Sequence, residues 1–374
     1  MWGSVLGRIQ IILIFERMHI QFEPREQTSK VFKILAPFIT ILLAMMVGAI
    51  PLVWTGINPL LAYKSILIGA CGNMYGISET LVKAIPLLLC GLAVALPLRA
   101  NLWNVGGEGQ FLMGAFGASV VALYLPQLPG LVLIPLMIIA GFLAGMVWGV
   151  IPGVLNARFK VSEILVTLMM NYIALNWVAY LVYGPMRDRK GTLNFPVTPK
   201  FVQHAWFPRF PKTRLHIGIF LAVIIAILLY IIINKMKIGY KIRVVGANPS
   251  VAQYGGIDTA RMTILVMTFA GGIAALAGVG DVAALHHQLR KDIVIGYGYT
   301  AIPVALLGKK HPIGIIFSAV LFSAMLVGGS NMQQDLGVPV ALVSVIQALV
   351  VLFIVAGDTL QTYRIRVERS EGSG

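Results

Sequence analysis

Charged residues are scarce in this chain: Asp, Glu, Lys and Arg make up 11% of 374 residues, against about 25% in an ordinary soluble domain. Hydrophobic residues make up 58%, and the mean hydropathy is +0.86. These values exclude an ordinary soluble domain and indicate a protein of the lipid bilayer. Cysteine is also scarce. Cys71 and Cys90 show no metal-ligand spacing, so we expect two small buried hydrophobic side chains and neither a metal site nor a cofactor.

Motifs for nucleotide and zinc chemistry are absent from the sequence. G-x-x-x-x-G-K-[ST] and H-E-x-x-H occur nowhere, and the pair Gly308-Lys309 lacks the upstream glycine and the hydroxyl of a phosphate-binding loop. The stretch GVGDVA, residues 278–283, matches a loose dinucleotide fingerprint, but it closes an apolar span. Small residues that let helices approach closely explain it better. We therefore predict that the chain is not an enzyme and contains no ATPase.

Acidic residues are too few to balance the basic ones, and the net charge is +15. Most Lys and Arg residues lie in short connections between apolar spans, as expected for loops that face an anionic cytoplasmic leaflet. No basic groove with interleaved aromatic residues is visible, which argues against nucleic acid as a partner. Membrane lipid is the expected surrounding.

Long apolar runs dominate the remaining sequence. A helix needs about 20 apolar residues to cross the hydrocarbon core, and the sequence predicts an all-α polytopic membrane protein with ten such helices. Three of the spans are short and interrupted by Gly, Pro or polar residues, namely 81–98, 108–125 and 293–308, which favours broken or re-entrant helices. The other seven are 31–54, 130–151, 163–184, 216–234, 262–282, 312–330 and 341–358.

Ten spans place both ends of the chain on one side of the membrane. If that side is the cytoplasm, 18 of the 29 basic residues lie inside, in agreement with the positive-inside rule. We expect an N-terminal cytoplasmic or interfacial segment (1–29), a transmembrane domain (30–360) and a cytoplasmic tail (361–374). For residues 1–29, an interfacial helix competes with a translation start at Met18, which we favour.

One loop opposes the positive-inside trend. The outer loop 185–215 holds seven basic residues together with Pro and Trp. It is too long for a simple connector. Either it docks a partner or it is only a solvated loop.

The stretch NLWNVGGEGQFLMGAFGA, residues 101–118, puts the ionisable Glu108 among glycines at the start of a predicted span. A carboxylate near the bilayer centre costs about 2.5–3.5 kcal/mol, so Glu108 should face the bundle interior, be protonated or lie at an aqueous boundary. Three roles fit these conditions: capping the N-terminus of its own helix, a buried hydrogen bond to Asn101 or Asn104, and contact with a polar solute.

A related pattern recurs in the second half of the chain. Residues 106–117 and 295–308 each pair a G-x-G with a short, interrupted span. Such pairs indicate two pseudo-symmetric halves with a central passage or binding site. For polar residues within spans, bonding between helices is the competing interpretation, and it applies to Asn176 and Gln347 as well. The candidate passage or solute-contacting residues are Asn101, Trp103, Asn104, Glu108, Gln110, Asn171, Tyr297 and Tyr299.

The connection 235–261 is too apolar and too rich in glycine for a solvated linker. Asn248-Pro249-Ser250 is a helix-start signal, residues 251–254 can form one or two turns, and Gly255-Gly256 ends them. We expect a short helix across the cytoplasmic face that inserts into a groove of a partner.

Four of these stretches carry a resemblance to a known family. GYKIRVVGANPSVAQYGGI (239–257) resembles the coupling segment of permease subunits of bacterial ABC importers, in the branch that includes ribose and branched-chain amino acid permeases. Residues 101–118 resemble that branch's Asn-x-Gly-x-Glu-Gly-Gln element, in the form typical of nucleoside and related sugar permeases. Residues 161–174 and 296–314 resemble two further elements. Pro303 departs from the family, which more often has alanine there.

The resemblance implies a complex in the bacterial inner membrane, with two permease subunits, two cytoplasmic ABC ATPases and an extracytoplasmic substrate-binding lipoprotein. The second permease is expected to be a related but different chain. The expected solute is a nucleoside, with a simple, ribose-like sugar as the alternative. Contact with the ATPase is implied for Gly246, Ala247, Asn248, Pro249, Ala252, Tyr254 and Gly255.

Two other functions stay open at this point. An ion-coupled secondary transporter would need paired intramembrane carboxylates, and the sequence offers essentially Glu108 alone. A membrane scaffold or receptor that transports nothing would not need broken, polar-lined spans.

Overall fold

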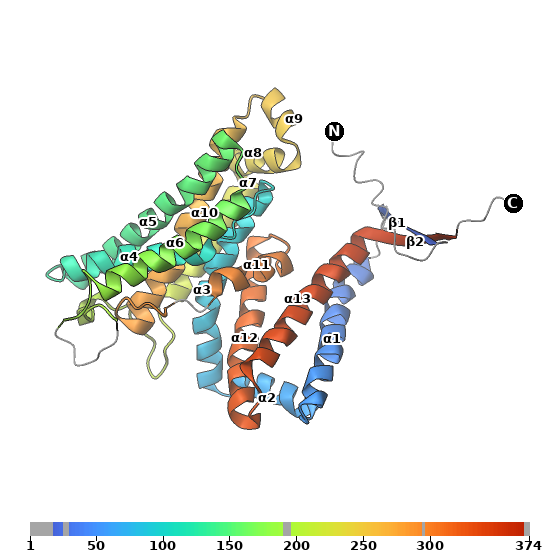
Figure 1. Cartoon of the computed structure of the whole chain (residues 1–374), viewed down its shortest axis with the longest axis horizontal. Helices are drawn as coiled ribbons and strands as arrows, with labels where there is room; N and C mark the ends of the chain where they lie inside the picture. Colours follow the sequence, from blue (N-terminus) through green and yellow to red (C-terminus); the bar gives the residue numbers. More distant parts are fainter. Residues whose placement is uncertain (1–17, 25–29, 190–195, 294–295, 370–374) are drawn as a thin grey trace. The chain divides into compact units, whose positions relative to one another are not determined.

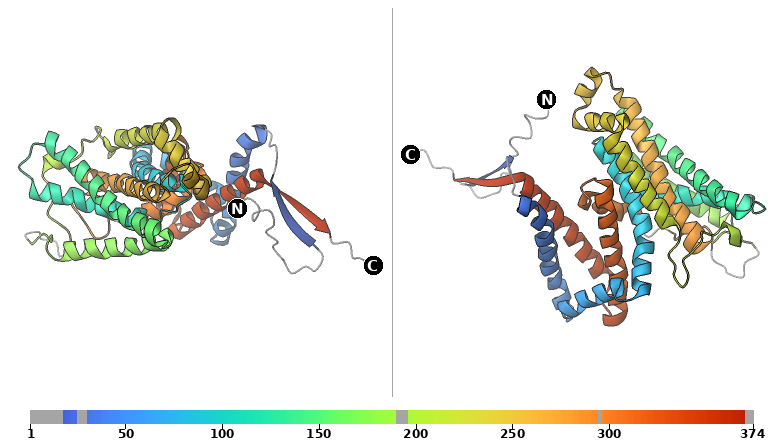
Figure 2. Two further views of the ribbon diagram at one scale, coloured as in Figure 1. Left: turned by 90° about the horizontal axis from the view of Figure 1, so that it is seen from above. Right: turned by 180° about the vertical axis from the view of Figure 1, so that it is seen from behind.

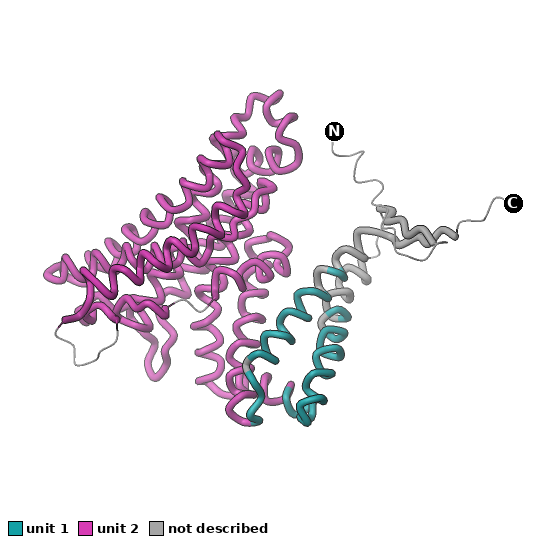
Figure 3. Tube along the Cα trace, viewed as in Figure 1, with its two compact units in different colours: residues 1–62, 336–374 teal, residues 63–335 magenta. Residues whose placement is uncertain are grey.

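The computed structural model describes residues 18–24, 30–189, 196–293 and 296–369 (Figure 1). The interpretation of residues 1–29 therefore lies largely outside the described residues. Over the described residues the chain is an all-α polytopic membrane protein with thirteen α-helices and one small sheet. It divides into two compact units, residues 1–62 with 336–374 and residues 63–335 (Figure 3).

The first unit is built from the two ends of the chain. Helices α1 (Lys30–Trp54) and α13 (Val340–Thr362) pack on each other, and β1 (Met18–Pro24) pairs antiparallel with β2 (Tyr363–Arg369). The sequence did not predict these strands. Each is only seven residues long, and pairing across nearly the whole chain leaves no local signal.

The second unit contains the other helices; its first residue, Tyr63, lies within α2, and its last, Asp335, lies within α12. α2 is Pro59–Cys71, α3 Met74–Arg99, α4 Gly107–Tyr124, α5 Gly130–Phe159, α6 Glu163–Tyr183, α7 Gly218–Lys235, α8 Lys237–Ala247, α9 Pro249–Tyr254, α10 Thr259–Asp281, α11 Tyr297–Leu307 and α12 Pro312–Leu336. Two short helical turns, η1 (Gln203–Ala205) and η2 (Val282–His286), complete it.

Each of the ten predicted spans coincides with one helix. Among the described residues, six helices are long and apolar enough to cross a membrane, and a seventh span results if residues 42–54 and 59–71 count together. One expectation was wrong: the segment 81–98 is neither short nor broken, because it belongs to the 26-residue helix α3, which continues through Pro86 and Pro97. The sequence also did not predict α2, whose apolar run is interrupted by Tyr63-Lys64-Ser65.

Helices α3 and α10 form the centre of the second unit. Their most apolar stretches are 89% and 83% buried, against 22% for α5. The expected pair of buried cysteines is only half correct, since Cys90 on α3 is buried but Cys71, the last residue of α2, is exposed.

Small residues set the spacing around α10. Along α5, glycine recurs at every fourth position, so one face of that helix is nearly flat where it lies on α10. Where α10 crosses α4, a side chain at Gly278 would overlap the carbonyl oxygen of Phe111. The expectation that the small residues of 270–280 permit close helix packing is therefore confirmed. The α5 glycines of this face are Gly141, Gly145, Gly149 and Gly153.

We expect Gly278→Ala to lower the melting temperature of the purified protein, because its Cβ would collide with the backbone of α4. Overpacking of this kind costs about 1–3 kcal/mol. Gly280→Ala is the matched control on the same helix, since the nearest atom to its added Cβ, His216 Cε1, is 3.7 Å away. Thermal unfolding in detergent, followed by size-exclusion chromatography, compares the two variants. Equal melting temperatures would contradict the close packing of α4 on α10.

Candidate functional site

A proline near the end of α3, just before the connection to α4, leaves a carbonyl free. Pro97 has no N–H to donate to the Ala93 oxygen, and the Asn104 side chain fills this gap, with its Nδ2 at 3.4 Å from that oxygen. Asn104 also donates to Gln110 Oε1 at 2.9 Å, and Gln110 Nε2 returns a bond to Asn104 Oδ1 at 3.1 Å. Both side chains are 1% exposed. Asn104 and Gln110 therefore bond each other and fix the connection between α3 and α4.

Glu108 lies in the first turn of α4 and is 5% exposed. Its Oε1 accepts the N–H of Gly296 at 2.9 Å, and its Oε2 accepts the N–H of Gly298 at 2.6 Å. These two N–H groups belong to the start of α11, so Glu108 caps the N-terminus of that helix. A carboxylate is favoured there by the helix dipole as well as by the hydrogen bonds.

Both structural roles that the sequence offered for Glu108 named the wrong partner. Its carboxylate neither caps its own helix nor bonds Asn101 or Asn104, because the N-termini of α4 and α11 meet each other. Glycine makes this approach possible: a Cβ on Gly107 would lie 3.2 Å from the Cα of Gly298. The two G-x-G elements noted in the sequence are therefore in direct contact.

Asn171 on α6 ties this meeting point to a third helix. Its Oδ1 accepts the N–H of Gly109 at 2.8 Å, while its Nδ2 donates to the Val105 carbonyl at 2.9 Å and to the Tyr299 hydroxyl at 3.1 Å. The side chain is buried, and its amide is engaged at both ends. Asn176, one turn and a half further along, bonds only the Tyr172 carbonyl of its own helix and joins no other helix through that bond.

Accessibility separates the candidate residues. Tyr299 is 39% exposed and Trp103 is 38% exposed, so their rings can be reached from outside the protein, whereas Tyr297 packs against Phe111 and is 5% exposed. Asn101 is exposed and adopts the left-handed conformation, with φ at 58°. The structure gathers six candidates where α4 and α11 meet and leaves Asn101 and Trp103 at the edge. The six are Asn104, Glu108, Gln110, Asn171, Tyr297 and Tyr299.

The predicted short helix in 235–261 is confirmed as α9. Asn248 Oδ1 accepts the N–H groups of Ser250 at 3.0 Å and of Val251 at 3.2 Å, as the helix-start signal requires. Ala252 is fully buried, while Tyr254 is 96% exposed. Together with α8, this helix lies at one end of the second unit (Figures 1 and 2).

The end of the unit that carries α9 also receives α3 and α11. The Arg99 guanidinium donates to the Lys310 carbonyl from Nε at 2.9 Å and from Nη2 at 2.8 Å. Gly246, at the end of α8, lies against the Arg99 carbonyl with no room for a side chain. Because α11 is only 11 residues long, it connects this end directly with Glu108 over about 16 Å.

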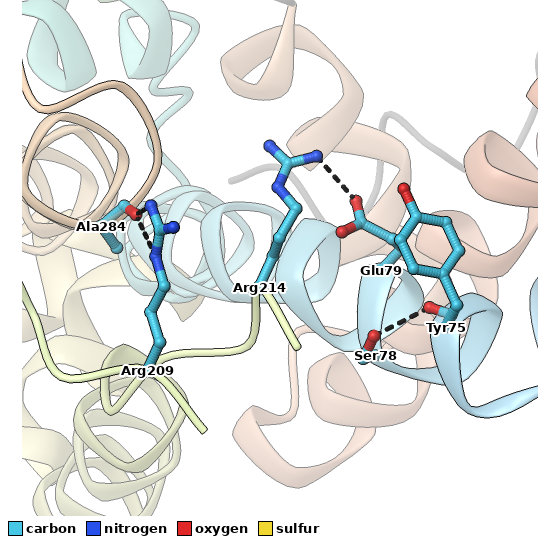
Figure 4. Close-up of polar contacts among 6 residues, drawn as sticks. All are labelled: Tyr75, Ser78, Glu79, Arg209, Arg214 and Ala284. Carbon is cyan, nitrogen blue, oxygen red and sulfur yellow. Dashed lines mark hydrogen bonds and ion pairs between the residues drawn. The ribbon is translucent and has the colours of Figure 1, made fainter. Parts of the chain in front are cut away.

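The loop 185–215 is not merely solvated, since its described part folds back onto the helices. Arg209 Nε donates to the Ala284 carbonyl at 2.9 Å, and Arg214 Nη1 lies 3.3 Å from Glu79 Oε2 (Figure 4). The Trp206 ring stacks on His287 with 3.9 Å between centroids. The length of the loop 185–215 therefore reflects its packing onto α3, α10 and η2.

Comparison with known proteins gives one family and several relatives. The family described as the permease component of branched-chain amino acid transport systems matches residues 76–355. A glucose ABC transporter permease of Haloferax volcanii is 34% identical, over 94% of each chain. A nucleoside ABC transporter permease of Lactococcus lactis is 34% identical over 87% of this chain and 92% of its own. A guanosine ABC transporter permease of Bacillus subtilis is 33% identical over 88% and 94%.

No solved structure matches the chain.

We expect Glu108→Gln to lower the melting temperature and the yield of folded protein. Glutamine offers one acceptor oxygen, so one of the two glycine N–H groups loses its partner and faces the new amide N–H₂. Loss of a hydrogen bond to a charged group costs about 1.5–3 kcal/mol. Thermal unfolding of the purified protein measures the effect.

The control for this variant is Asp292→Asn, which removes a carboxylate that is 70% exposed and should leave the melting temperature unchanged. Normal assembly of Glu108→Gln with loss of transport would contradict a structural role and assign Glu108 to the passage.

We expect the loop around Trp206 to undock as the pH falls from about 6.5 towards 4. Burial and the neighbouring Arg209 lower the pKa of His287 to about 4, whereas an unperturbed histidine titrates near 6.5. The docked His287 is neutral: its Nδ1 donates to the Ala283 carbonyl and its Nε2 accepts from Arg209 at 2.7 Å. Its contribution is therefore full above the unperturbed pKa and is lost as the ring protonates.

Hydrogen-exchange protection factors of residues 201–216 at pH 7.5 and pH 5, corrected for the pH dependence of intrinsic amide exchange, measure this undocking. His287→Gln should show a weaker pH dependence. The variant keeps a part of the pH dependence through His216, because burial and Arg209 lower the pKa of His216 to about 4 as well. Equal protection factors of the wild type at both pH values would contradict the role of a neutral His287.

Proposed function

Because this chain belongs to the family of permease components of branched-chain amino acid transport systems, we propose that it forms the path of a nucleoside through an ATP-driven importer. As a member of this family it is a multi-pass membrane permease of an ABC transporter, and not an enzyme. Such permeases work with ATPase subunits and a binding protein. Relatives named for nucleoside and guanosine transport support the solute.

The contact between the N-termini of α4 and α11 is the observation that carries this proposal. Two half-helices that meet near the middle of a membrane protein are the usual setting of a solute site. Glu108 neutralises the positive end of α11 in this protein, so the site favours an uncharged polar solute over an anion. Tyr299, whose hydroxyl is bonded by Asn171, supplies an accessible aromatic ring at this meeting point, and Trp103 supplies a second accessible ring at its edge; a nucleobase can stack on such rings.

The ATPase contact is proposed at α9 and the residues around it, 246–255. Tyr254 projects almost completely free of the rest of the protein, as a side chain for a partner's groove does. Movement at this end reaches α11 through Arg99, which holds the Lys310 carbonyl after the end of α11. Since α11 is short and its other end is bound by Glu108, displacement of α9 shifts the site between α4 and α11.

The arrangement in the membrane follows from the same proposal. We place the chain in the bacterial inner membrane with α9 and both termini in the cytoplasm. The binding lipoprotein then meets the face that carries the loop 185–215. A second permease, related to this chain but different, completes the path. A simple sugar is the second candidate solute, and it is favoured by the glucose permease relative, at 34% identity.

Uptake of radiolabelled guanosine and glucose by a strain that carries only this transport system tests the proposal. We expect guanosine uptake that stops on ATP depletion. Uptake that persists after ATP depletion and stops with an uncoupler would contradict it, and would favour an ion-coupled transporter.

In the same assay, Tyr254→Ala should reduce uptake at least tenfold, because truncating a central interface aromatic costs about 2 kcal/mol or more. The amount of the variant in the membrane should stay unchanged, while co-purification of the ATPase falls. Tyr172→Ala is the matched control, since this tyrosine is 55% exposed on α6, away from α9. Full uptake by Tyr254→Ala would exclude α9 as the ATPase contact.

A further inference from the structure

A second polar region lies where α2, α3 and α12 meet, apart from the residues between α4 and α11. A pocket of about 210 Å³ opens there, which we name the Glu79 pocket. Glu79 and Lys83 stand four residues apart on α3, so their side chains share one face of that helix. Its polar lining is Asn73, Tyr75, Glu79, Lys83, Ser330, Asn331 and Gln334.

Glu79 lines this pocket and has one acceptor oxygen without a partner among the described residues. The residue is 7% exposed, and its Oε2 is paired with Arg214 at 3.3 Å (Figure 4). Its Oε1 is buried and accepts no hydrogen bond from any described residue. A buried carboxylate oxygen without a partner is costly and uncommon in a native protein. The pocket therefore offers a place for a donor from outside the chain.

Hydrogen bonds within the protein hold two other side chains of the pocket wall in place. Asn73 Oδ1 accepts the N–H of Gly76 at 2.6 Å and so begins α3. Asn331 Nδ2 donates to Asp335 Oδ2 at 2.7 Å and to Ser65 Oγ at 3.1 Å, which ties α12 to α2. Glu79 thus stands beside Asn73 and Asn331, two lining side chains that these bonds hold in place, as a binding site requires.

The charges of the lining select a neutral ligand. Glu79 and Lys83, the two charged residues of the lining, have opposite signs, so the lining favours neither a cation nor an anion. A ring with neighbouring hydroxyl groups satisfies the carboxylate without adding charge. The pocket is smaller than the roughly 300–1,000 Å³ that encloses a drug-sized ligand, so it fits one sugar ring and not a whole nucleoside.

The position of the pocket along α3 suits a site that the solute reaches before the meeting point of α4 and α11. Glu79 lies in the second turn of α3, whereas Ala93, which Asn104 contacts, comes 14 residues later, or about 21 Å along the helix. The pocket lies at the end of α3 opposite Arg99 and α9.

We propose that the Glu79 pocket is an outer subsite that binds the hydroxyl-bearing ring of the transported solute before the solute reaches Tyr299. This rests on the proposed function, which makes this end of α3 the outer one. Glu79 accepts hydrogen bonds from the ring hydroxyls. Arg214 ties the subsite to the loop 185–215, where the binding lipoprotein would deliver the solute.

The test is Glu79→Gln in the uptake assay, with the transported solute and its deoxy analogue. For guanosine the analogue is 2′-deoxyguanosine, and for glucose it is 2-deoxyglucose. We expect the KM for the hydroxylated solute to rise roughly tenfold, as loss of a hydrogen bond to a charged group implies. The KM for the deoxy analogue should change less than twofold, and the maximal rate should stay the same. Asp292→Asn, an exposed carboxylate outside the pocket, is the matched control.

Unchanged KM values, or the same rise for both solutes, would overturn the subsite. A second variant, Gln334→Leu, changes an exposed position on the pocket rim and is compatible with folding if Glu79→Gln fails to assemble. It should raise the KM for the hydroxylated solute, and an unchanged KM overturns the proposal. Failure of the proposed function is a separate result: the wild type then takes up neither nucleoside nor sugar in an ATP-dependent way.

Discussion

The capping of α11 by Glu108 is the contact on which the arrangement of the second unit depends. A carboxylate inside a membrane is costly by itself, at about 2.5–3.5 kcal/mol near the centre. Two backbone N–H groups and the dipole of α11 offset this cost, and the same bonds satisfy donors that a short helix would otherwise leave free. The carboxylate and the helix end are each unfavourable alone and stable together, so the start of α4 and the start of α11 form one structural piece.

That contact is possible only because glycine removes the side chains that would keep the helices apart. Gly107 and Gly298 let the two N-termini meet, and Gly278 lets α10 lie on the backbone of α4. Between helices in lipid, close van der Waals packing replaces the hydrophobic driving force that soluble proteins use. The glycines around Glu108 are therefore best understood as the condition for its hydrogen bonds. Asn171 then adds α6 to the same network through both ends of its amide.

Local signals in the sequence predicted what local physics decides. The apolar runs located ten of the helices, and the Asn248 cap with its glycine stop located α9, because a cap bonds residues two and three positions away. The partner of Glu108 could not be predicted in this way, since Gly296 and Gly298 are some 190 residues distant along the chain. The strands β1 and β2 were missed for the same reason. The polar residues 101–110 were recognised as a candidate site, yet only the structure separates buried Asn104 and Gln110 from accessible Trp103 and Tyr299.

The polar groups of the second unit are distributed along α3 in an order that suits transport. Glu79 and its pocket stand near one end, Asn104 reaches the Ala93 carbonyl further along, and Arg99 binds the Lys310 carbonyl at the other end. Helix α11 packs on α3. It is attached at both ends, to Glu108 at its start and, through Lys310, to Arg99 after its end. A rigid helix of 11 residues attached at both ends transmits a displacement at one end to the other. A force on α9 would therefore be felt at the meeting point of α4 and α11, beside Tyr299.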